Sequence, residues 1–202
     1  MLATHPGPMS IESFLDWIAR QDDRHELVDG FSIRMMAGAK QSHNVVVGNL
    51  ADAMRPGAKA AGCRATSNDT AIISGPGSVR YPDIVVDCVP ANPDAMTASD
   101  PRILVEVLSP STSQIDFSDK LDEYRRLASV EVILLVDPDI VSVKVYRRAA
   151  DGGWMAERYD DLDASIELPM IGSTVMLRTI YDTLAPKTRP AMSVVGEGNG
   201  TA

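Results

Sequence analysis

The spacing of hydrophobic residues predicts three helices. Apolar residues recur with a helical period over 11–18, directly behind Ser10, whose side chain can cap the first turn. A second periodic stretch covers 42–55, and Pro56-Gly57 should stop or kink that helix. A third helix is expected over about 116–128, with its apolar residues on one stripe.

Shorter apolar runs between turn residues predict strands. Asp29-Gly30 separates two such runs and favours a hairpin, because both central residues of a type I′ turn need a positive φ. The runs 102–108 and 131–136 flank the third helix and should form a right-handed βαβ crossover. The other strands are expected at 70–74, 79–89, 141–148 and 154–159.

These elements predict an α/β or α+β fold with a mixed central sheet flanked by helices. No linker or repeat interrupts the pattern, so a single domain is expected over 10–185, between tails at 1–9 and 186–202. The chain of 202 residues, 45% of them hydrophobic, is long enough for a sizeable core. The composition excludes a disordered, collagen-like or coiled-coil chain.

Charge and cysteine content narrow the function classes. With 19 basic and 28 acidic residues the net charge is -9, so a basic footprint for nucleic acid over the whole molecule is absent. Contact with a phosphate polymer would need a local patch or a bound cation. Cys63 and Cys88 make neither a disulfide framework nor a C-x-x-C pair, and no secretory signal or membrane-spanning stretch is visible. We therefore expect reduced cysteines in a cytoplasmic protein without membrane contact.

Two acidic residues stand in otherwise apolar strands. Asp83 lies at the start of the apolar run 81–89, and Glu106 lies within 102–108 on the same face as Leu104 and Leu108. If these strands are neighbours, the carboxylates converge, and their repulsion raises one pKa unless a cation neutralises both. Hard oxygen ligands of this kind suit Mg²⁺ or Mn²⁺. Alternatively, Glu106 pairs with an arginine across the sheet and Asp83 caps a turn.

Lys120 is the third candidate for chemistry. It lies four residues after Asp116 and four before Tyr124 on the predicted third helix. It either forms a solvated ion pair with Asp116 or, because it shares a face with Tyr124 and Leu127, reaches into the cleft. A lysine beside a metal can orient the attacking water and stabilise charge that builds on a phosphate.

Five motifs occur in a set order along the chain. They are Glu26-Leu27-Val28-Asp29-Gly30, Ser42-His43-Asn44, Arg80-Tyr81-Pro82-Asp83, Val105-Glu106-Val107-Leu108-Ser109-Pro110-Ser111-Thr112, and the helical spacing of Asp116, Lys120 and Tyr124. Together they resemble the Uma-two family of restriction-endonuclease-like proteins, also called domain of unknown function 820, in the PD-(D/E)XK nuclease superfamily. The resemblance covers roughly residues 10–184.

The resemblance implies a mixed sheet whose acidic residues hold a divalent metal, Mg²⁺ or in its place Mn²⁺. Asp83 and Glu106 match the two acids of the superfamily motif, and the carbonyl of Val107 is a candidate third ligand. Glu26 resembles an extra acid that many such nucleases carry on an early element. A surface carboxylate at a strand start remains the alternative for Glu26.

The chain departs from the family pattern at Leu108, where a lysine is expected two residues after Glu106. Lys120 resembles a migrated substitute, and the acid pair, Lys120 and the resemblance together favour a metal-dependent endonuclease that hydrolyses DNA. An acidic chain should bind DNA only modestly. Two subunits side by side would help to grip a duplex, so a homodimer is expected. Leu108 also supports an alternative, a catalytically inactive nuclease-fold module that binds nucleic acid or a protein partner. A small-molecule phosphohydrolase using the same metal site is a third interpretation.

His43 and Tyr124 are candidate substrate-binding residues. His43 stands at the head of the second helix, where amide donors favour an anion such as DNA phosphate. Its neighbours Ser42 and Asn44 could serve only as helix caps. Tyr124 also fits the core, because it lies on the inner stripe of the third helix.

Overall fold

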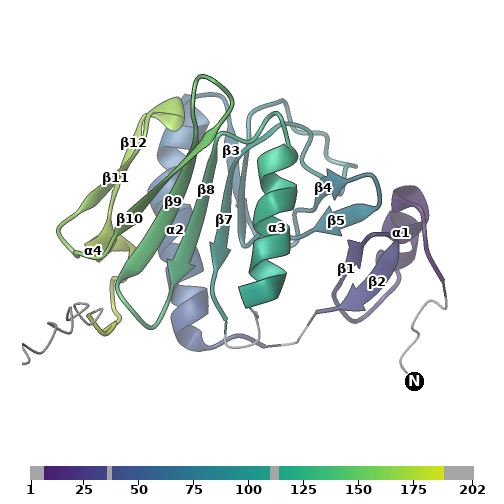
Figure 1. Cartoon of the computed structure of the whole chain (residues 1–202), viewed down its shortest axis with the longest axis horizontal. Helices are drawn as coiled ribbons and strands as arrows, with labels where there is room; N and C mark the ends of the chain where they lie inside the picture. The colour runs from purple at the N-terminus through teal and green to yellow at the C-terminus, as the bar shows by residue number, and fades with distance from the viewer. Residues whose placement is uncertain (1–6, 36–37, 110–113, 189–202) are drawn as a thin grey trace, which may run out of the picture.

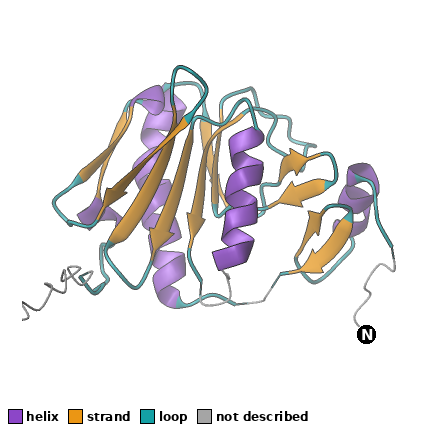
Figure 2. Ribbon diagram, in the orientation of Figure 1, coloured by secondary structure: helices purple, strands orange, loops and turns teal. Residues whose placement is uncertain are grey.

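The computed structural model describes residues 7–35, 38–109 and 114–188. It consists of a six-stranded sheet with a helix on each face, a four-stranded sheet beside it, and a two-stranded sheet near the C-terminus (Figure 1, Figure 2). Most of the two predicted tails lies outside the described residues. Lys187, in the predicted C-terminal tail, forms a parallel bridge beside Ile140: its amide donates to the carbonyl of Asp139, and its carbonyl accepts from the amide of Val141. The domain boundaries themselves stay a prediction.

The large sheet is mixed, as the sequence predicts. Its strand order is β10-β9-β8-β7-β6-β3, and only β7 and β8 run parallel, joined by helix α3. All other neighbours in this sheet are antiparallel. The strands are β3 (Arg64–Ser67), β6 (Ile84–Asp87), β7 (Pro101–Val107), β8 (Val132–Asp137), β9 (Ser142–Arg148) and β10 (Trp154–Tyr159).

Helices α2 (Gln41–Ala60) and α3 (Gln114–Arg126) cover opposite faces of this sheet (Figure 1). Side chains alternate along β7, so Val105 packs in the core beneath α2 while Leu104 packs in the core beneath α3. Because both faces are covered, β7 is buried along most of its length. The acidic residue within it, Glu106, is on the α3 side together with Leu104.

The smaller sheet has the order β2-β1-β5-β4, with helix α1 (Ile11–Ile18) packed on one face. The predicted cap is confirmed, since Ser10 accepts a hydrogen bond from the amide of Ser13. The predicted hairpin is confirmed too, because Asp29 and Gly30 both have positive φ, 49° and 86°. The strands are β1 (His25–Val28), β2 (Phe31–Arg34), β4 (Ile72–Gly75) and β5 (Ser78–Arg80).

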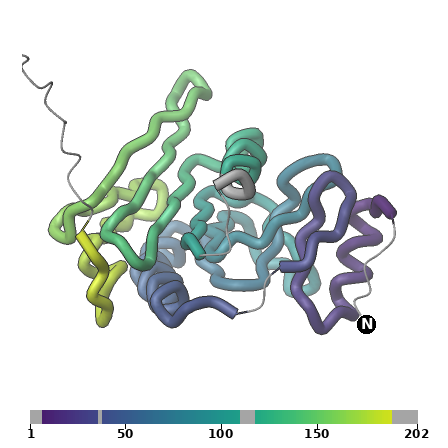
Figure 3. Tube along the Cα trace, turned by 60° about the horizontal axis from the view of Figure 1, so that its bottom comes forward, coloured from purple at the N-terminus to yellow at the C-terminus, as the bar shows by residue number. Residues whose placement is uncertain are grey.

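The C-terminal segment packs against α2, on the side away from the smaller sheet (Figure 3). It comprises β11 (Ser165–Leu168), the 3-10 turn η1 (Pro169–Ile171), β12 (Ser173–Met176) and α4 (Leu177–Ile180). None of the helices in the described part of the chain is long and apolar enough to cross a membrane.

The single strand predicted over 79–89 was wrong. The chain forms two strands there, β5 in the smaller sheet and β6 in the larger one, separated by Tyr81-Pro82-Asp83. Pro82 has no amide hydrogen to donate to a ladder, so the chain leaves one sheet there and enters the other. This break places Asp83 immediately before β6.

Pro56 does not end the second helix, contrary to the sequence prediction. Helix α2 continues to Ala60 with Pro56 inside it. Met54 and Ala58, on either side of the proline, are buried in the core, while Pro56 is on the exposed face. Water can therefore reach the carbonyl that lacks a donor, and core packing keeps the helix continuous. The helix begins at Gln41, with Lys40 in the cap position and no side-chain cap, so neither Ser42 nor Asn44 caps it.

The expectation of two reduced cysteines was also wrong. Cys63 and Cys88 form a disulfide that joins the start of β3 to the end of β6. These strands are antiparallel, and Arg64 pairs with Asp87 in the ladder, which brings the adjacent cysteines opposite each other. Residues 25 apart in the sequence thus meet across an edge of the sheet.

Helix α2 packs closely against the C-terminal segment at Gly57, so a glycine-to-alanine substitution there should have an unusual effect on stability. A Cβ on Gly57 would collide with the carbonyl oxygen of Ile171 and the hydroxyl of Ser173. Gly57→Ala should therefore destabilise the fold by about 1–3 kcal/mol, although alanine normally favours a helix. In the same helix, Gly48 has nothing within 4 Å of its added Cβ, so Gly48→Ala should stabilise by up to about 1 kcal/mol. Urea unfolding measures both, and stabilisation by Gly57→Ala would contradict this packing.

Candidate active site

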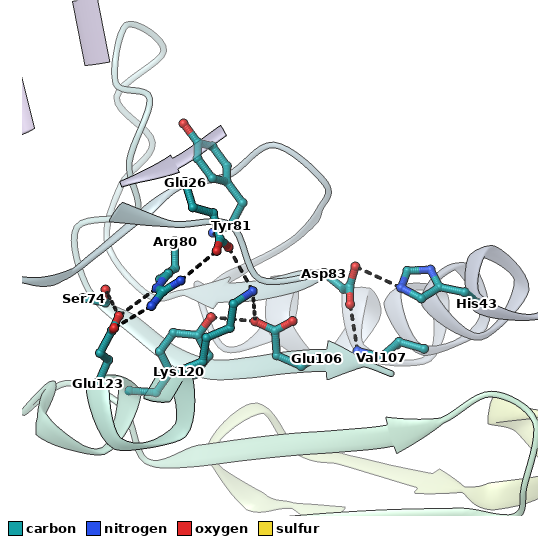
Figure 4. A network of polar contacts seen from close by, with 11 residues as sticks. Glu26, His43, Ser74, Arg80, Tyr81, Asp83, Glu106, Val107, Lys120 and Glu123 are labelled. Atoms are coloured by element: carbon teal, nitrogen blue, oxygen red, sulfur yellow. Dashed lines mark hydrogen bonds and ion pairs between the residues drawn. The ribbon is translucent and has the colours of Figure 1, made fainter. Parts of the chain in front are cut away.

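Asp83 and Glu106 lie side by side because of the register between β6 and β7. Ile84 pairs with Val105 in this antiparallel ladder, so the residues one step further out, Asp83 and Glu106, face each other. Both line a cleft of about 550 Å³ between the two sheets and the ends of α2 and α3, and this cleft is also lined by Glu26, His43 and Lys120. The structure thus brings the predicted acids and the predicted lysine to one place (Figure 4).

Asp83 is held from two sides. Its Oδ2 accepts a hydrogen bond from the amide of Val107 at 2.7 Å, and its Oδ1 lies 3.4 Å from His43 Nε2. The hydrogen bond with Asp83 raises the pKa of His43, against the effect of burial, and the backbone of Val107 contributes in the same direction. The cationic form of His43 is therefore favoured beside this carboxylate.

Glu106 lies in a more apolar environment. Burial raises the pKa of Glu106 to about 7, and the charge of Lys120 opposes this rise while the charge of Asp83 adds to it. The hydroxyl of Tyr124 donates to Glu106 Oε1 at 2.6 Å, and Lys120 Nζ lies 3.6 Å from the same oxygen. No arginine pairs with Glu106 across the sheet among the described contacts, so the alternative interpretation of this residue was wrong.

Tyr124 is fully buried, and burial raises its pKa well above the ordinary value. It supports Glu106 from beneath and is not among the residues that line the cleft. This position agrees with the expectation of a core tyrosine. It does not agree with a direct contact to substrate, because the hydroxyl is already engaged and the ring is covered.

Lys120 reaches the cleft and bridges two acids. Its Nζ lies 2.9 Å from Glu26 Oε1, nearer than to Glu106. Glu26 is buried as well, so the interpretation of it as a surface carboxylate was wrong. The amide of Tyr81 donates to Glu26 Oε1 at 3.4 Å, and Arg80 donates to Glu26 Oε2 at 2.9 Å.

Three further residues, Arg80, Glu123 and Ser74, extend this network, and none of them was among the site residues predicted from the sequence. Arg80 donates to Glu123 from Nε and from a terminal nitrogen, at 2.9 and 2.7 Å, and Ser74 donates to Glu123 at 2.6 Å. Burial raises the pKa of Glu123, but the hydrogen bonds from Arg80 and Ser74 lower it overall. A sequence signal existed, since Glu123 is three residues after Lys120 and so shares its helix face.

The donor set around Asp83 fits a divalent cation of the Mg²⁺ type. The carboxylates of Asp83 and Glu106 and the carbonyl of Val107 are hard oxygen donors. Burial, with the charge of Asp83 in addition, raises the pKa of Glu106, and a bound cation would offset both effects. Within the described ranges, no group of three or more histidine, cysteine, aspartate or glutamate side chains is arranged to hold a metal. A cation here would need the backbone carbonyl, water or substrate oxygens to complete its ligands.

The pKa of Glu106 is raised and that of Glu123 is lowered, so replacing each by glutamine should change the free energy of unfolding in opposite directions. The raised pKa of Glu106 means that its ionisation opposes folding, increasingly from about pH 4.5 to about pH 7. Glu106→Gln should therefore stabilise the metal-free protein by about 1–3 kcal/mol at about pH 8 and have little effect below pH 4.5.

The lowered pKa of Glu123 means that its ionised form stabilises the fold above about pH 4.5, and this effect is lost as the pH falls through the native pKa. Glu123→Gln should destabilise by about 1–3 kcal/mol at neutral pH. Urea unfolding across this pH range measures both variants. Effects of the same sign at about pH 8 would contradict the charge arrangement.

Comparison with known proteins agrees with this fold. Residues 11–178 match a family model, Uma2, described as "Putative restriction endonuclease". The chain is 31% identical over 179 residues to the uncharacterized protein slr1290 of Synechocystis, a match that covers 88% of this chain and 93% of the relative.

A solved structure with a similar fold is a protein from Anabaena variabilis, described as a putative nuclease belonging to DUF820. It aligns with a TM-score of 0.70 and 21% identity, over 86% of this chain and 97% of that one. The sequence-based resemblance is thereby confirmed. The chain belongs to the Uma2 family of restriction-endonuclease-like proteins, and its mixed α/β fold is shared with a nuclease-family neighbour.

Proposed function

We propose that the protein is a metal-dependent endonuclease that hydrolyses phosphodiester bonds in DNA. The observation that carries this proposal is the meeting of Asp83, Glu106 and Lys120 in one cleft, in a chain of a family described as restriction endonucleases. Two carboxylates and an amine beside an open cleft suit water attack on a phosphate. Either acid alone would support only a structural role.

Asp83, Glu106 and the carbonyl of Val107 would hold the ion, Mg²⁺ with Mn²⁺ as a substitute. When bound, a divalent ion of this kind lowers the pKa of a coordinated water and offsets charge on the phosphate. The amide of Val107 fixes the orientation of the Asp83 carboxylate, and the hydroxyl of Tyr124 fixes that of Glu106. Both acids are therefore held ready before any ligand arrives.

Lys120 would act on the reacting groups directly. Its ammonium can donate hydrogen bonds to the attacking water or to a phosphate oxygen, where negative charge builds in the transition state. Glu26 would hold this ammonium in place through the 2.9 Å contact. The inactive-module alternative depends on Leu108 in the place of the motif lysine. The 3.6 Å approach of Lys120 to Glu106 weakens that alternative, because an amine reaches the acids from α3.

DNA is the proposed substrate despite the net charge of -9. The cleft itself carries positive groups, since Arg24, Arg34 and His43 are among its lining residues. Binding should be modest and salt-sensitive, because non-specific affinity for DNA comes from counterion release by lysine and arginine. The cytoplasm stays the proposed place of action on the ground of the DNA substrate alone, because the cysteines expected to be reduced there form a disulfide.

Variants of the three central residues should separate metal binding from catalysis. We expect saturable Mn²⁺ binding by calorimetry, with a non-cleavable oligonucleotide present, in the parent and in Lys120→Met but not in Asp83→Ala. Each of the variants Asp83→Ala, Glu106→Gln and Lys120→Met should lower plasmid cleavage by at least about 100-fold.

Two results would favour the other interpretations. DNA binding that persists in EDTA, without cleavage under any divalent metal by folded protein, supports the inactive module. Turnover of a generic phosphodiester with no effect on DNA supports a small-molecule phosphohydrolase.

We also propose that the protein acts as a homodimer, because two acidic subunits side by side can grip a duplex that one subunit holds weakly. Sedimentation velocity at micromolar concentration should show a dimer. A monomer that still cleaves duplex DNA efficiently would contradict this part of the proposal.

A further inference from the structure

Arg80 connects the candidate active site to a half-buried acid, Glu123, behind it. It is the last residue of β5, and the neighbouring strand β1 brings Glu26 beside it, one position along from the paired Leu27 and Val79. Only 3% of the Arg80 side chain is exposed. An arginine this deeply buried must have its charge matched by carboxylates, and Glu26 and Glu123 do so.

The guanidinium is used on two sides at once. One terminal nitrogen lies 2.9 Å from Glu26 Oε2, and the rest of the fork makes two hydrogen bonds to the two oxygens of Glu123. A planar guanidinium can hold one carboxylate with two parallel bonds and still donate to a second one, which an ammonium on a flexible stem does not reproduce. Through Arg80, Glu123 on helix α3 thus helps to fix the position of Glu26.

Lys120 and Glu123 are three residues apart on α3, so they point to the same side of the helix. Glu123 docks on Arg80, and Lys120 docks on Glu26, which Arg80 also contacts (Figure 4). Three ion pairs link the four side chains in a row, from Lys120 through Glu26 and Arg80 to Glu123. One turn of α3 joins the two ends of this row. Any shift of Arg80 would therefore move the acid that holds Lys120.

Arg80 also balances charge. Glu26 contacts two cations, at 2.9 Å each, and its two oxygens are divided between them. Without Arg80, the whole charge of Glu26 would act on Lys120 and draw the ammonium away from Glu106. With Arg80 in place, Lys120 is shared between Glu26 and Glu106.

We propose that Arg80 and Glu123 are positioning residues, which fix the carboxylate of Glu26 so that it holds the Lys120 ammonium beside Glu106. This inference rests on the proposed role of Lys120 in DNA cleavage. Arg80 lines the cleft, but each of its three guanidinium nitrogens already donates to one of the two carboxylates and only 3% of its side chain is exposed, so we assign it to positioning and not to substrate contact.

The test compares Arg80→Met with Arg102→Met. Arg102 also pairs with two carboxylates, those of Asp100 and Glu131, but it does not line the cleft. In Arg80→Met we expect kcat for DNA cleavage to fall between about tenfold and 100-fold, with KM and Mn²⁺ affinity within about twofold of the parent, because only the lysine is misplaced. Arg102→Met should keep the parental kcat per folded molecule.

A second measurement does not need activity. The ammonium of Lys120 can be observed by ¹⁵N NMR in a chain with five lysines and assigned by the loss of its signal in Lys120→Met. The signal should shift in Arg80→Met and stay unchanged in Arg102→Met. If the parent does not cleave DNA, the proposed function fails, and the NMR signal alone decides the positioning role: a shift supports it and an unchanged signal overturns it.

Arg80→Lys and Glu123→Gln keep the inference testable if Arg80→Met does not fold. A lysine at position 80 can pair with only one of the two acids. The kcat of Arg80→Lys should therefore be below that of the parent and, where Arg80→Met folds, above that of Arg80→Met. Folded Arg80→Lys and Glu123→Gln with parental kcat and an unchanged Lys120 signal would overturn the proposal. A rise in KM with constant kcat would also overturn it, since that result assigns Arg80 to substrate binding.

Discussion

Buried carboxylates around one cleft are the constraint on which the arrangement of this protein depends. An ionised carboxylate removed from water needs a cation or several hydrogen bonds, or it takes up a proton. Here the cations come from different elements: Arg80 from β5, Lys120 from α3 and His43 from α2. Among the described contacts, neither Glu26 on β1 nor Glu106 on β7 is paired with a cation from its own strand. The two sheets and both long helices must therefore come together before the charges are matched, which couples the formation of the site to the formation of the fold.

Local patterns predicted most of the elements, because each depends on neighbours in the sequence. The Ser10 cap and the Asp29-Gly30 turn are of this kind, and both were confirmed. The parallel pairing of β7 with β8 is a longer-range contact, and it was predictable because two buried strands joined by a helix rarely connect in another way. The errors arose where distant contacts decide the outcome. Pro56 remains inside a helix because core residues on both sides hold it, and the chain near Pro82 divides between two sheets that the apolar run does not distinguish. The Cys63–Cys88 pairing likewise depends on strand register, which spacing alone does not reveal.

The site residues that could be predicted are those whose type is unusual for their place in the sequence. Asp83 and Glu106 stand out because they interrupt apolar strands, and Lys120 because it lies on the apolar side of a helix. Arg80 and Glu123 do not stand out, since an arginine at a strand end and a glutamate in a polar helix are ordinary surface residues. They meet over a separation of 43 residues, and only the fold shows that Arg80 is buried and that Glu123 is half-buried against it. Their burial, not their residue type, marks them as part of the site.

The short passage from β5 to β6 has a mechanical consequence. Arg80 belongs to the smaller sheet and Asp83 stands at the entry to the larger one, so the two halves of the candidate site are joined by a link whose middle residue, Pro82, has a fixed φ. A link this short and stiff transmits rotation instead of absorbing it. The two sheets should therefore move together, so that Arg80 and Asp83 keep their relative positions when a substrate enters the cleft.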